Sequence, residues 1–265
     1  MRRTDYSAIA TVFDDNQARL RIPPDALLGE LLDAPREGDR GRLAGPRLDR
    51  AFEVLDVGCG TGNYLAVQAQ AFAGRGVAFS GVDPSDAMLA KARAKLTGVA
   101  LSIGRAEALP YEAERFDYVT SSFAFHHFED KGRALDELVR VLRRGGGLRI
   151  ANLAPSLMTG WWLYRYFPEA GLEDEKRFWS PALLLHELSA RGLVARANVE
   201  IAIEHVPLTQ VLTDALRRDT SELVILDEAT YQRGVDRIRA ELERDAAASV
   251  PSELALARWS ARRPG

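Results

Sequence analysis

The stretch that decides the fold is VLDVGCGTG at residues 54–62, an apolar run followed directly by the alternating glycines Gly58, Gly60 and Gly62. The run predicts a buried strand, and the residues after Gly62 predict a helix. Glycine at such a turn permits positive φ and lets a ligand approach the main chain closely. Because the first helical turn presents unpaired N–H groups and a positive dipole end, the turn predicts a site for an anionic group such as a carboxylate.

The spacing of the glycines argues against a dinucleotide site. The GxGxxG pattern typical of dinucleotide binding needs glycine at position 63, where this chain has Asn63. Asp83 ends the next predicted strand, about 20 residues after the last glycine, where a carboxylate can accept hydrogen bonds from both hydroxyls of a ribose. An anion site and a ribose acceptor without a pyrophosphate clamp fit an adenosine that carries an amino-acid tail.

Strand and helix patterns alternate on both sides of this turn, which predicts an α/β fold with a doubly wound, mostly parallel sheet. Two further strands, at 193–203 and around 254–259, bring the expected sheet to seven strands, and the helical patterns between them predict an insertion that covers one end. The first five strands are expected at 52–57, 77–82, 100–103, 116–121 and 147–152, the last after a three-glycine turn, and the helices at 62–72, 85–96 and 131–142.

The chain is expected to form a single domain of 265 residues. Residues 1–50 would form a helical N-terminal cover and a Gly- and Pro-containing linker, residues 51–152 the ligand-binding core, and residues 153–265 a substrate cover with the last strands. The cover contains the aromatic residues Trp161, Trp162, Tyr164, Tyr166, Phe167, Phe178 and Trp179, which would line an apolar pocket or attach the cover to the sheet.

Composition excludes several other classes of protein. Hydrophobic residues make up 46% of the chain, and the formal net charge of −3 gives no sign of a nucleic-acid-binding surface. No apolar run approaches the length of a membrane-spanning helix, and no signal-peptide core follows the basic start. The single cysteine, Cys59, excludes an intramolecular disulfide and fits a reducing compartment, so a cytoplasmic location is expected.

Four segments together resemble the class I S-adenosylmethionine-dependent methyltransferases, in particular the branch of ubiquinone and menaquinone biosynthesis and other small-molecule methyltransferases. The resemblance covers roughly residues 6–152, where the segments occur in the order and spacing of that family. The segments are VLDVGCGTG, GVDPSDAMLAKAR, GRAEALPYEAERFDYVTSSFAFHHF and ELVRVLRRGGGLRIAN.

The resemblance implies S-adenosylmethionine as the cofactor. Asp56 and the backbone of the three glycines would hold its methionine end, and Asp83 its ribose. Met88 would pack near the adenine, although a methionine at this helical spacing is also an ordinary core residue. Ser121 would face the ligand from the end of its strand, or serve to cap that strand. The full set is Asp56, Gly58, Gly60, Gly62, Asp83, Met88, Ala106, Glu107 and Ser121.

The chain departs from the family pattern at the adenine. Many relatives have an aspartate that accepts from the adenine amino group, and this chain has Arg105 there. Because arginine has no acceptor, the contact must be lost or made by Glu107 or a backbone carbonyl, while the Ala106 N–H can still serve a ring nitrogen. Arg105 itself is expected to be a solvated surface residue.

The candidate general bases are His126 and His127, with Tyr164 as a third candidate. A neutral imidazole can take a proton from an acceptor hydroxyl, although the two adjacent histidines can also be structural. No HExxH string, EF-hand or cysteine cluster appears, so a mechanism without a metal is expected. Tyr6 and Phe13, in the N-terminal helix, are expected to close over the cofactor.

These observations favour methyl transfer from S-adenosylmethionine to a small, partly apolar molecule by in-line displacement. The alternative is a non-catalytic S-adenosylmethionine-binding sensor or partner subunit. A nicotinamide oxidoreductase fits less well because of Asn63. Nucleic acid and membrane insertion are not expected, and the sequence gives no signal about oligomeric state.

Overall fold

The computed structural model describes residues 22–34 and 50–265, and their strands form one seven-stranded sheet in the order β3-β2-β1-β4-β5-β7-β6. The neighbours from β3 to β5 pair in parallel, whereas β7 is antiparallel to both β5 and β6. The predicted α/β class with a mostly parallel sheet is therefore confirmed. The strands are β1 (Phe52–Val57), β2 (Val77–Asp83), β3 (Ala100–Ile103), β4 (Phe116–Ser122), β5 (Leu142–Leu153), β6 (Val194–Pro207) and β7 (Ser249–Arg262).

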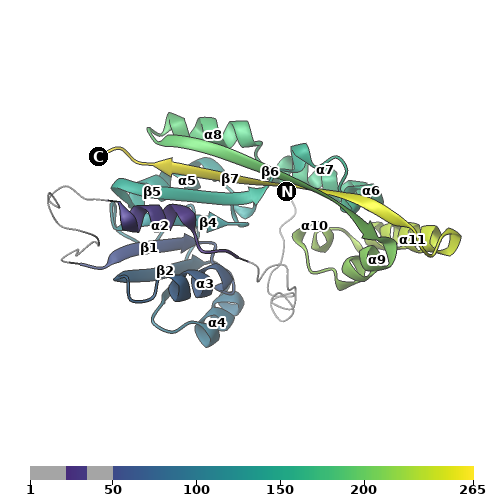
Figure 1. Cartoon of the computed structure of the whole chain (residues 1–265), viewed down its shortest axis with the longest axis horizontal. Helices are drawn as coiled ribbons and strands as arrows, with labels where there is room; N and C mark the ends of the chain where they lie inside the picture. Colours follow the sequence, from purple (N-terminus) through teal and green to yellow (C-terminus); the bar gives the residue numbers. More distant parts are fainter. Residues whose placement is uncertain (1–21, 35–49) are drawn as a thin grey trace.

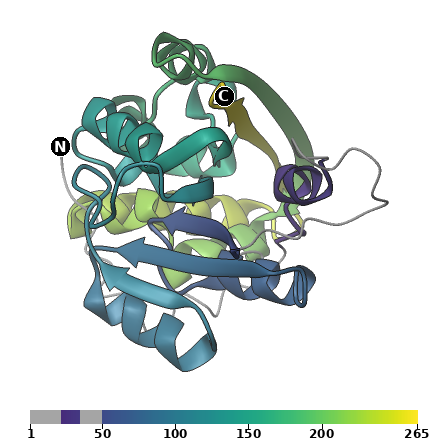
Figure 2. The ribbon, with the colours of Figure 1, turned by 90° about the vertical axis from the view of Figure 1, so that its left-hand side faces the viewer.

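Helices cover both faces of the sheet (Figure 2). Several begin at a side-chain cap: Ser85 Oγ accepts from the Met88 N–H, and the carboxylate of Asp130 accepts from the Arg133 N–H. The helices are α2 (Ala26–Asp33), α3 (Asn63–Ala71), α4 (Asp86–Lys95), α5 (Lys131–Val141), α6 (Trp162–Tyr166), α7 (Pro168–Arg177), α8 (Pro181–Ala190), α9 (Leu208–Arg217), α10 (Ser221–Val224) and α11 (Glu228–Arg244), with short 3₁₀ turns η3 (Phe125–His127) and η4 (Pro155–Leu157).

The sheet separates two apolar clusters. Leu28 and Leu32 of α2 pack with Leu65 of α3, Val54 of β1 and Tyr118 of β4. On the other face, α5 and α8 pack on β4, β5 and the C-terminal segments. Because β1 and β2 are largely buried, their sequences are mostly apolar runs, which explains why they could be located from the sequence.

The C-terminal strands differ from the prediction in length. β6 and β7 pair along their whole length, and only residues 256–262 of β7 also pair with β5. They therefore continue past β5 as a two-stranded ribbon, and α9, α10 and α11 lie at its far end (Figure 1). The predicted helical insertion is confirmed, and its first helix, α9, begins at Leu208, directly after β6 ends at Pro207.

The three-glycine segment was wrongly predicted to be a turn before its strand. β5 already begins at Leu142, which pairs with Phe116, and the ladder then shifts register so that Tyr118 pairs with Gly147. The glycines therefore lie in an irregularity within the strand. The expectations for Tyr6, Phe13 and the linker fall at residues 1–21 and 35–49, outside the described residues. Within the described ranges, no helix has both the length and the apolar character needed to cross a membrane.

Candidate functional site

The three glycines of the β1–α3 turn have positive φ values but different surroundings. A Cβ at Gly58 would lie 2.4 Å from the Cβ of Ala124, and one at Gly62 would lie 2.6 Å from Cδ1 of Leu96. A Cβ at Gly60, where φ is +53°, would meet no atom of the described residues within 4 Å. Gly58 and Gly62 are thus needed for packing within the protein, whereas Gly60 leaves its main chain open to a ligand.

Asp83, the last residue of β2, is turned toward this glycine turn. Its Oδ2 accepts a hydrogen bond from the Gly60 N–H at 2.9 Å, and its Oδ1 accepts one from the Ser85 N–H at 2.9 Å. Burial raises the pKa of this carboxyl group, and the two hydrogen bonds oppose that shift. Because each carboxylate oxygen has a second lone pair, Asp83 can still accept from two hydroxyl groups.

Asp56, near the end of β1, is a buried acidic residue with an unused acceptor. Its side chain is almost fully buried, and its Oδ1 has no hydrogen-bond partner in the described part of the chain. Burial, followed by repulsion from Asp83, raises the pKa of Asp56 to about 8. Because buried polar atoms are normally hydrogen-bonded, this oxygen can accept from a cationic or hydrogen-bond-donating group of a ligand.

The residues predicted to contact the adenine follow Asp83 in the sequence. Met88 of α4 and Ala106 are both buried. Oε1 of Glu107 accepts from the Glu129 N–H at 2.7 Å, so this side chain supports the segment that leads into α5. Arg105 is 47% exposed and pairs with Glu129 at 2.6 Å, as expected for a surface residue.

Polar side chains also lie at the carboxyl end of β4. Ser121 is fully buried, and among the residues that the structure describes its Oγ has no hydrogen-bond partner. The same is true of Thr120 Oγ1, which the sequence analysis did not single out. Thr120 lies between Asp56 of β1 and Arg149 of β5 in the sheet register. Because paired residues in neighbouring strands share a face of the sheet, these three polar residues form a row across it.

The two histidines lie in η3, close to each other, with ring centroids 3.8 Å apart. His126 is buried and stacks on Phe178 at 4.2 Å. Burial lowers the pKa of both rings, to about 3 for His127, and the positive charge of Arg177 adds to the effect. Both imidazoles are therefore neutral at pH 7, and neither is strongly basic.

Most of the aromatic segment belongs to the core, since Trp161, Trp162, Tyr166 and Phe167 are all buried. Tyr164 donates its hydroxyl hydrogen bond to Asp174 at 2.7 Å, and burial raises its pKa. Asp174 also pairs with the buried Arg177, whose Nε and Nη1 have no hydrogen-bond partner. The Tyr164 hydroxyl is thus already hydrogen-bonded within a buried polar group that also contains Asp174 and Arg177.

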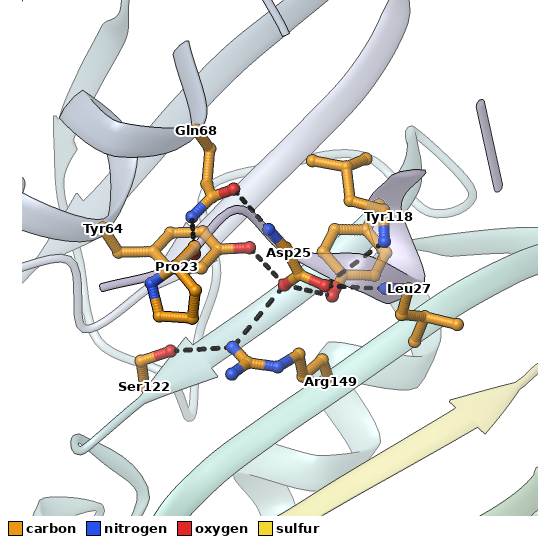
Figure 3. Close-up of polar contacts among 9 residues, drawn as sticks. Pro23, Asp25, Leu27, Tyr64, Gln68, Tyr118, Ser122 and Arg149 are labelled. Carbon is orange, nitrogen blue, oxygen red and sulfur yellow. Dashed lines mark hydrogen bonds and ion pairs between the residues drawn. The ribbon is translucent and has the colours of Figure 1, made fainter. Parts of the chain in front are cut away.

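Besides Thr120, two residues of the site region were missed. Asp25, just before α2, accepts hydrogen bonds from the hydroxyls of Tyr64 and Tyr118, and Arg149 lies beside it (Figure 3). The only signal in the sequence is a charged residue between Leu148 and Ile150, inside an otherwise apolar strand. Asp25 lies far from β5 in the sequence, so their proximity could not be foreseen.

The chain is similar to known methyltransferases in sequence. Residues 55–150 match the family model described as a methyltransferase domain. The chain is 34% identical over 158 residues to phthiotriol/phenolphthiotriol dimycocerosates methyltransferase of Mycobacterium leprae, which covers 56% of this chain and 56% of that protein. It is 30% identical over 155 residues to the ubiquinone/menaquinone biosynthesis C-methyltransferase UbiE of Geobacter sulfurreducens, which covers 48% of this chain and 60% of that protein. The chain thus spans little more than half the length of these relatives.

Solved structures share the fold at lower identity. The YcgJ protein of Bacillus subtilis matches with a TM-score of 0.57 at 20% identity, over 81% of this chain and 93% of that one. Phosphoethanolamine N-methyltransferase 2 of Haemonchus contortus, solved with phosphomonomethylethanolamine and S-adenosylhomocysteine, matches with a TM-score of 0.54 at 19% identity, over 97% of this chain and 58% of that one.

Proposed function

We propose that this chain, whose residues 55–150 form a class I S-adenosylmethionine-dependent methyltransferase domain, is an enzyme that transfers a methyl group to a small, partly apolar molecule. The matched methyltransferase domain and the relatives named for quinone biosynthesis confirm the resemblance expected from the sequence. The expected cofactor is supported by this domain and by the phosphoethanolamine N-methyltransferase 2 structure, which was solved with S-adenosylhomocysteine. The acceptor and the geometry of transfer are part of the proposal.

The residues of the β1–α3 turn fit this cofactor. The main chain at Gly60 is open, and the buried Oδ1 of Asp56 lacks a hydrogen-bond partner, as expected where an ammonium group binds. In our proposal, Asp56 and the backbone of Gly58, Gly60 and Gly62 hold the amino-acid tail. Asp83 holds the ribose with the lone pairs that Gly60 and Ser85 leave free.

The adenine would lie between Met88 and the backbone around Ala106. Both residues are buried, so they can supply an apolar contact and an N–H donor. Glu107 supports the entry to α5 through Oε1 and can accept from the adenine amino group only with its remaining lone pairs. Ser121, with its unpartnered Oγ, is the proposed contact from the end of β4.

The bound cofactor supplies an activated methyl group, and we propose transfer by in-line displacement. The protein's main task is then to orient the acceptor, which can lower the barrier by about 7–11 kcal/mol. His126 and His127 remain the proposed bases for a hydroxyl acceptor. Since their pKa values are lowered, we expect their neutral rings mainly to accept a hydrogen bond from the acceptor.

The proposed acceptor is small and partly apolar. Phe178 and Trp179 follow α7 and pack near His126 and Phe125, so aromatic surface adjoins the carboxyl end of β4. The relative from Geobacter sulfurreducens is named for ubiquinone/menaquinone biosynthesis, and the relative from Mycobacterium leprae for phthiotriol and phenolphthiotriol dimycocerosates. The single cysteine supports the proposed cytoplasmic location.

The observation that carries the proposal is the open main chain at Gly60 between Asp56 and Asp83. The test combines protein, S-adenosylmethionine labelled in the methyl group, and a panel of apolar hydroquinones and phenols. We expect label in the organic extract for some acceptors, and loss of transfer in Gly60→Ala. Cofactor binding by calorimetry without transfer to any acceptor would instead favour the non-catalytic binding protein.

A further inference from the structure

The row of polar residues shares Arg149 with a largely buried group that we call the Asp25 cluster. Its members are Asp25, Tyr64, Tyr118, Ser122 and Arg149 (Figure 3). The hydroxyls of Tyr64 and Tyr118 donate to Asp25 Oδ2 at 2.6 Å and 2.7 Å. Nη1 of Arg149 lies 3.5 Å from the same oxygen and donates to Ser122 Oγ at 3.3 Å. The cluster connects α2, α3, β4 and β5.

Asp25 is well satisfied without Arg149. Its Oδ1 accepts from the N–H groups of Leu27 and Leu28, which caps α2, and its own N–H donates to Gln68 Oε1 at 2.8 Å. The contact of 3.5 Å with Arg149 is long for a charged hydrogen bond. Asp25 therefore positions the guanidinium of Arg149 by charge attraction and leaves most of the guanidinium N–H donors unused.

Arg149 has hydrogen-bonding capacity that the protein leaves unused. A guanidinium has five N–H donors. Within the part of the chain that the structure describes, all hydrogen bonds and ion pairs of Arg149 involve Nη1, and none involves Nε or Nη2. The side chain is 17% exposed, so it is not fully enclosed by the protein.

The guanidinium lies close to the glycine turn. Its Cζ is 6.0 Å from the ring centroid of Tyr64, the second residue of α3 and two residues after Gly62. Arg149 also acts on Asp56, since its charge opposes the rise in the pKa of that carboxyl group. An unpartnered carboxylate oxygen and a cation with free donors thus lie at the same end of the site.

We propose that Arg149 binds the carboxylate of the cofactor's amino-acid tail while Asp56 accepts from its ammonium group. The bound ammonium group favours the ionised form of Asp56, so the two side chains then match the two charges of the tail. Asp25 is the positioning residue for Arg149. A guanidinium fork suits a carboxylate because it can donate two parallel hydrogen bonds. This inference rests on the proposed function. In the competing interpretation, Arg149 is only a structural partner of Asp25.

Calorimetry with two ligands separates these interpretations. The ligands are S-adenosylhomocysteine and its decarboxylated analogue, which keeps the adenosine and the ammonium group. For Arg149→Gln, we expect affinity for S-adenosylhomocysteine to fall about 10- to 100-fold, as for the loss of charged hydrogen bonds. Affinity for the decarboxylated analogue should stay within about twofold of wild type, since that ligand has no carboxylate to lose.

Two further variants serve as controls. Arg143→Gln removes an arginine from the amino end of the same strand, where it pairs with Asp117 at 3.0 Å, and should change neither affinity. Arg149→Lys keeps the charge beside Asp25 but loses the fork, so it should bind S-adenosylhomocysteine with intermediate affinity. It also provides the test if Arg149→Gln fails to fold by circular dichroism.

The outcomes distinguish the two claims. If wild type binds both ligands and the Arg149 variants leave the ratio of the two affinities unchanged, the inference is wrong and the proposed function stands. If the Arg149 variants lower the affinity for both ligands by the same factor, the role of Arg149 is structural, and the inference is again wrong. If wild type binds neither ligand, the proposed function is contradicted, and the inference with it.

Discussion

Replacing Gly60 by alanine should separate cofactor binding from folding. Gly60 has φ of +53°, and a Cβ there would meet no atom within 4 Å in residues 22–34 and 50–265. The only cost to the fold is therefore that of placing alanine at positive φ, about 1–2 kcal/mol. For a chain of this size, that cost corresponds to a fall in Tm of roughly 2–8 °C.

The effect on the cofactor should be larger, because the added methyl group occupies the open space where the tail is proposed to lie. Displacing the tail would remove at least one charge-assisted hydrogen bond, worth about 1.5–3 kcal/mol, which lowers affinity about 10- to 100-fold. Gly98→Ala is the matched control, since Gly98 has φ of +75° and equally open surroundings, but lies between α4 and β3. It should lose similar stability and no affinity.

The assay is isothermal titration with S-adenosylhomocysteine, paired with thermal unfolding of the same samples. Gly58→Ala should instead lose more stability than Gly60→Ala, because its Cβ would lie 2.4 Å from the Cβ of Ala124. This overpacking should lower the free energy of unfolding by a further amount of about 1–3 kcal/mol. Equal losses of affinity in Gly60→Ala and Gly98→Ala would refute the reasoning, since they would show that the turn has no special role in binding.

Further predictions concern charges. Asp83→Ala should lower the affinity for adenosine and for S-adenosylhomocysteine by the same factor, as measured by calorimetry. Unchanged affinity for adenosine would argue against a contact between Asp83 and the ribose. The pKa of Asp56 is raised to about 8, so the free energy of unfolding should fall as pH rises from about 4 to 8, and Asp56→Asn should flatten that slope in urea titrations. Asp174→Ala leaves Arg177 buried without its partner, which should cost about 3–5 kcal/mol in urea unfolding; a loss below about 1 kcal/mol would show that water reaches the arginine. With the pKa of His127 at about 3, the profile of kcat/KM against pH should have no inflection near 6.5, and such an inflection would indicate a histidine base of ordinary pKa.

The parallel core could be predicted because its signals are local. Each strand from β1 to β4 is a short apolar run, and the turn at 58–62 and the acid at Asp83 lie at strand ends that the sequence pattern identifies. The structure turns Asp83 toward Gly60, as the ribose hypothesis requires.

The remaining features depend on contacts between distant segments. The full length of β6 follows from its pairing with β7, which a single-strand pattern does not reveal. The register shift at the three glycines depends on the partner strand β4. Arg149 and Asp25 meet only because α2 packs beside β5, so neither residue could be assigned a role from its neighbours in the sequence.

The most direct test of the central claim is a crystal structure of the protein with S-adenosylhomocysteine. We predict that the amino-acid tail lies over the main chain of Gly60 and that the carboxylate of Asp83 accepts from both ribose hydroxyls. A ligand bound elsewhere, or an Asp83 carboxylate that contacts only Gly60 and Ser85 in the complex, would contradict the account.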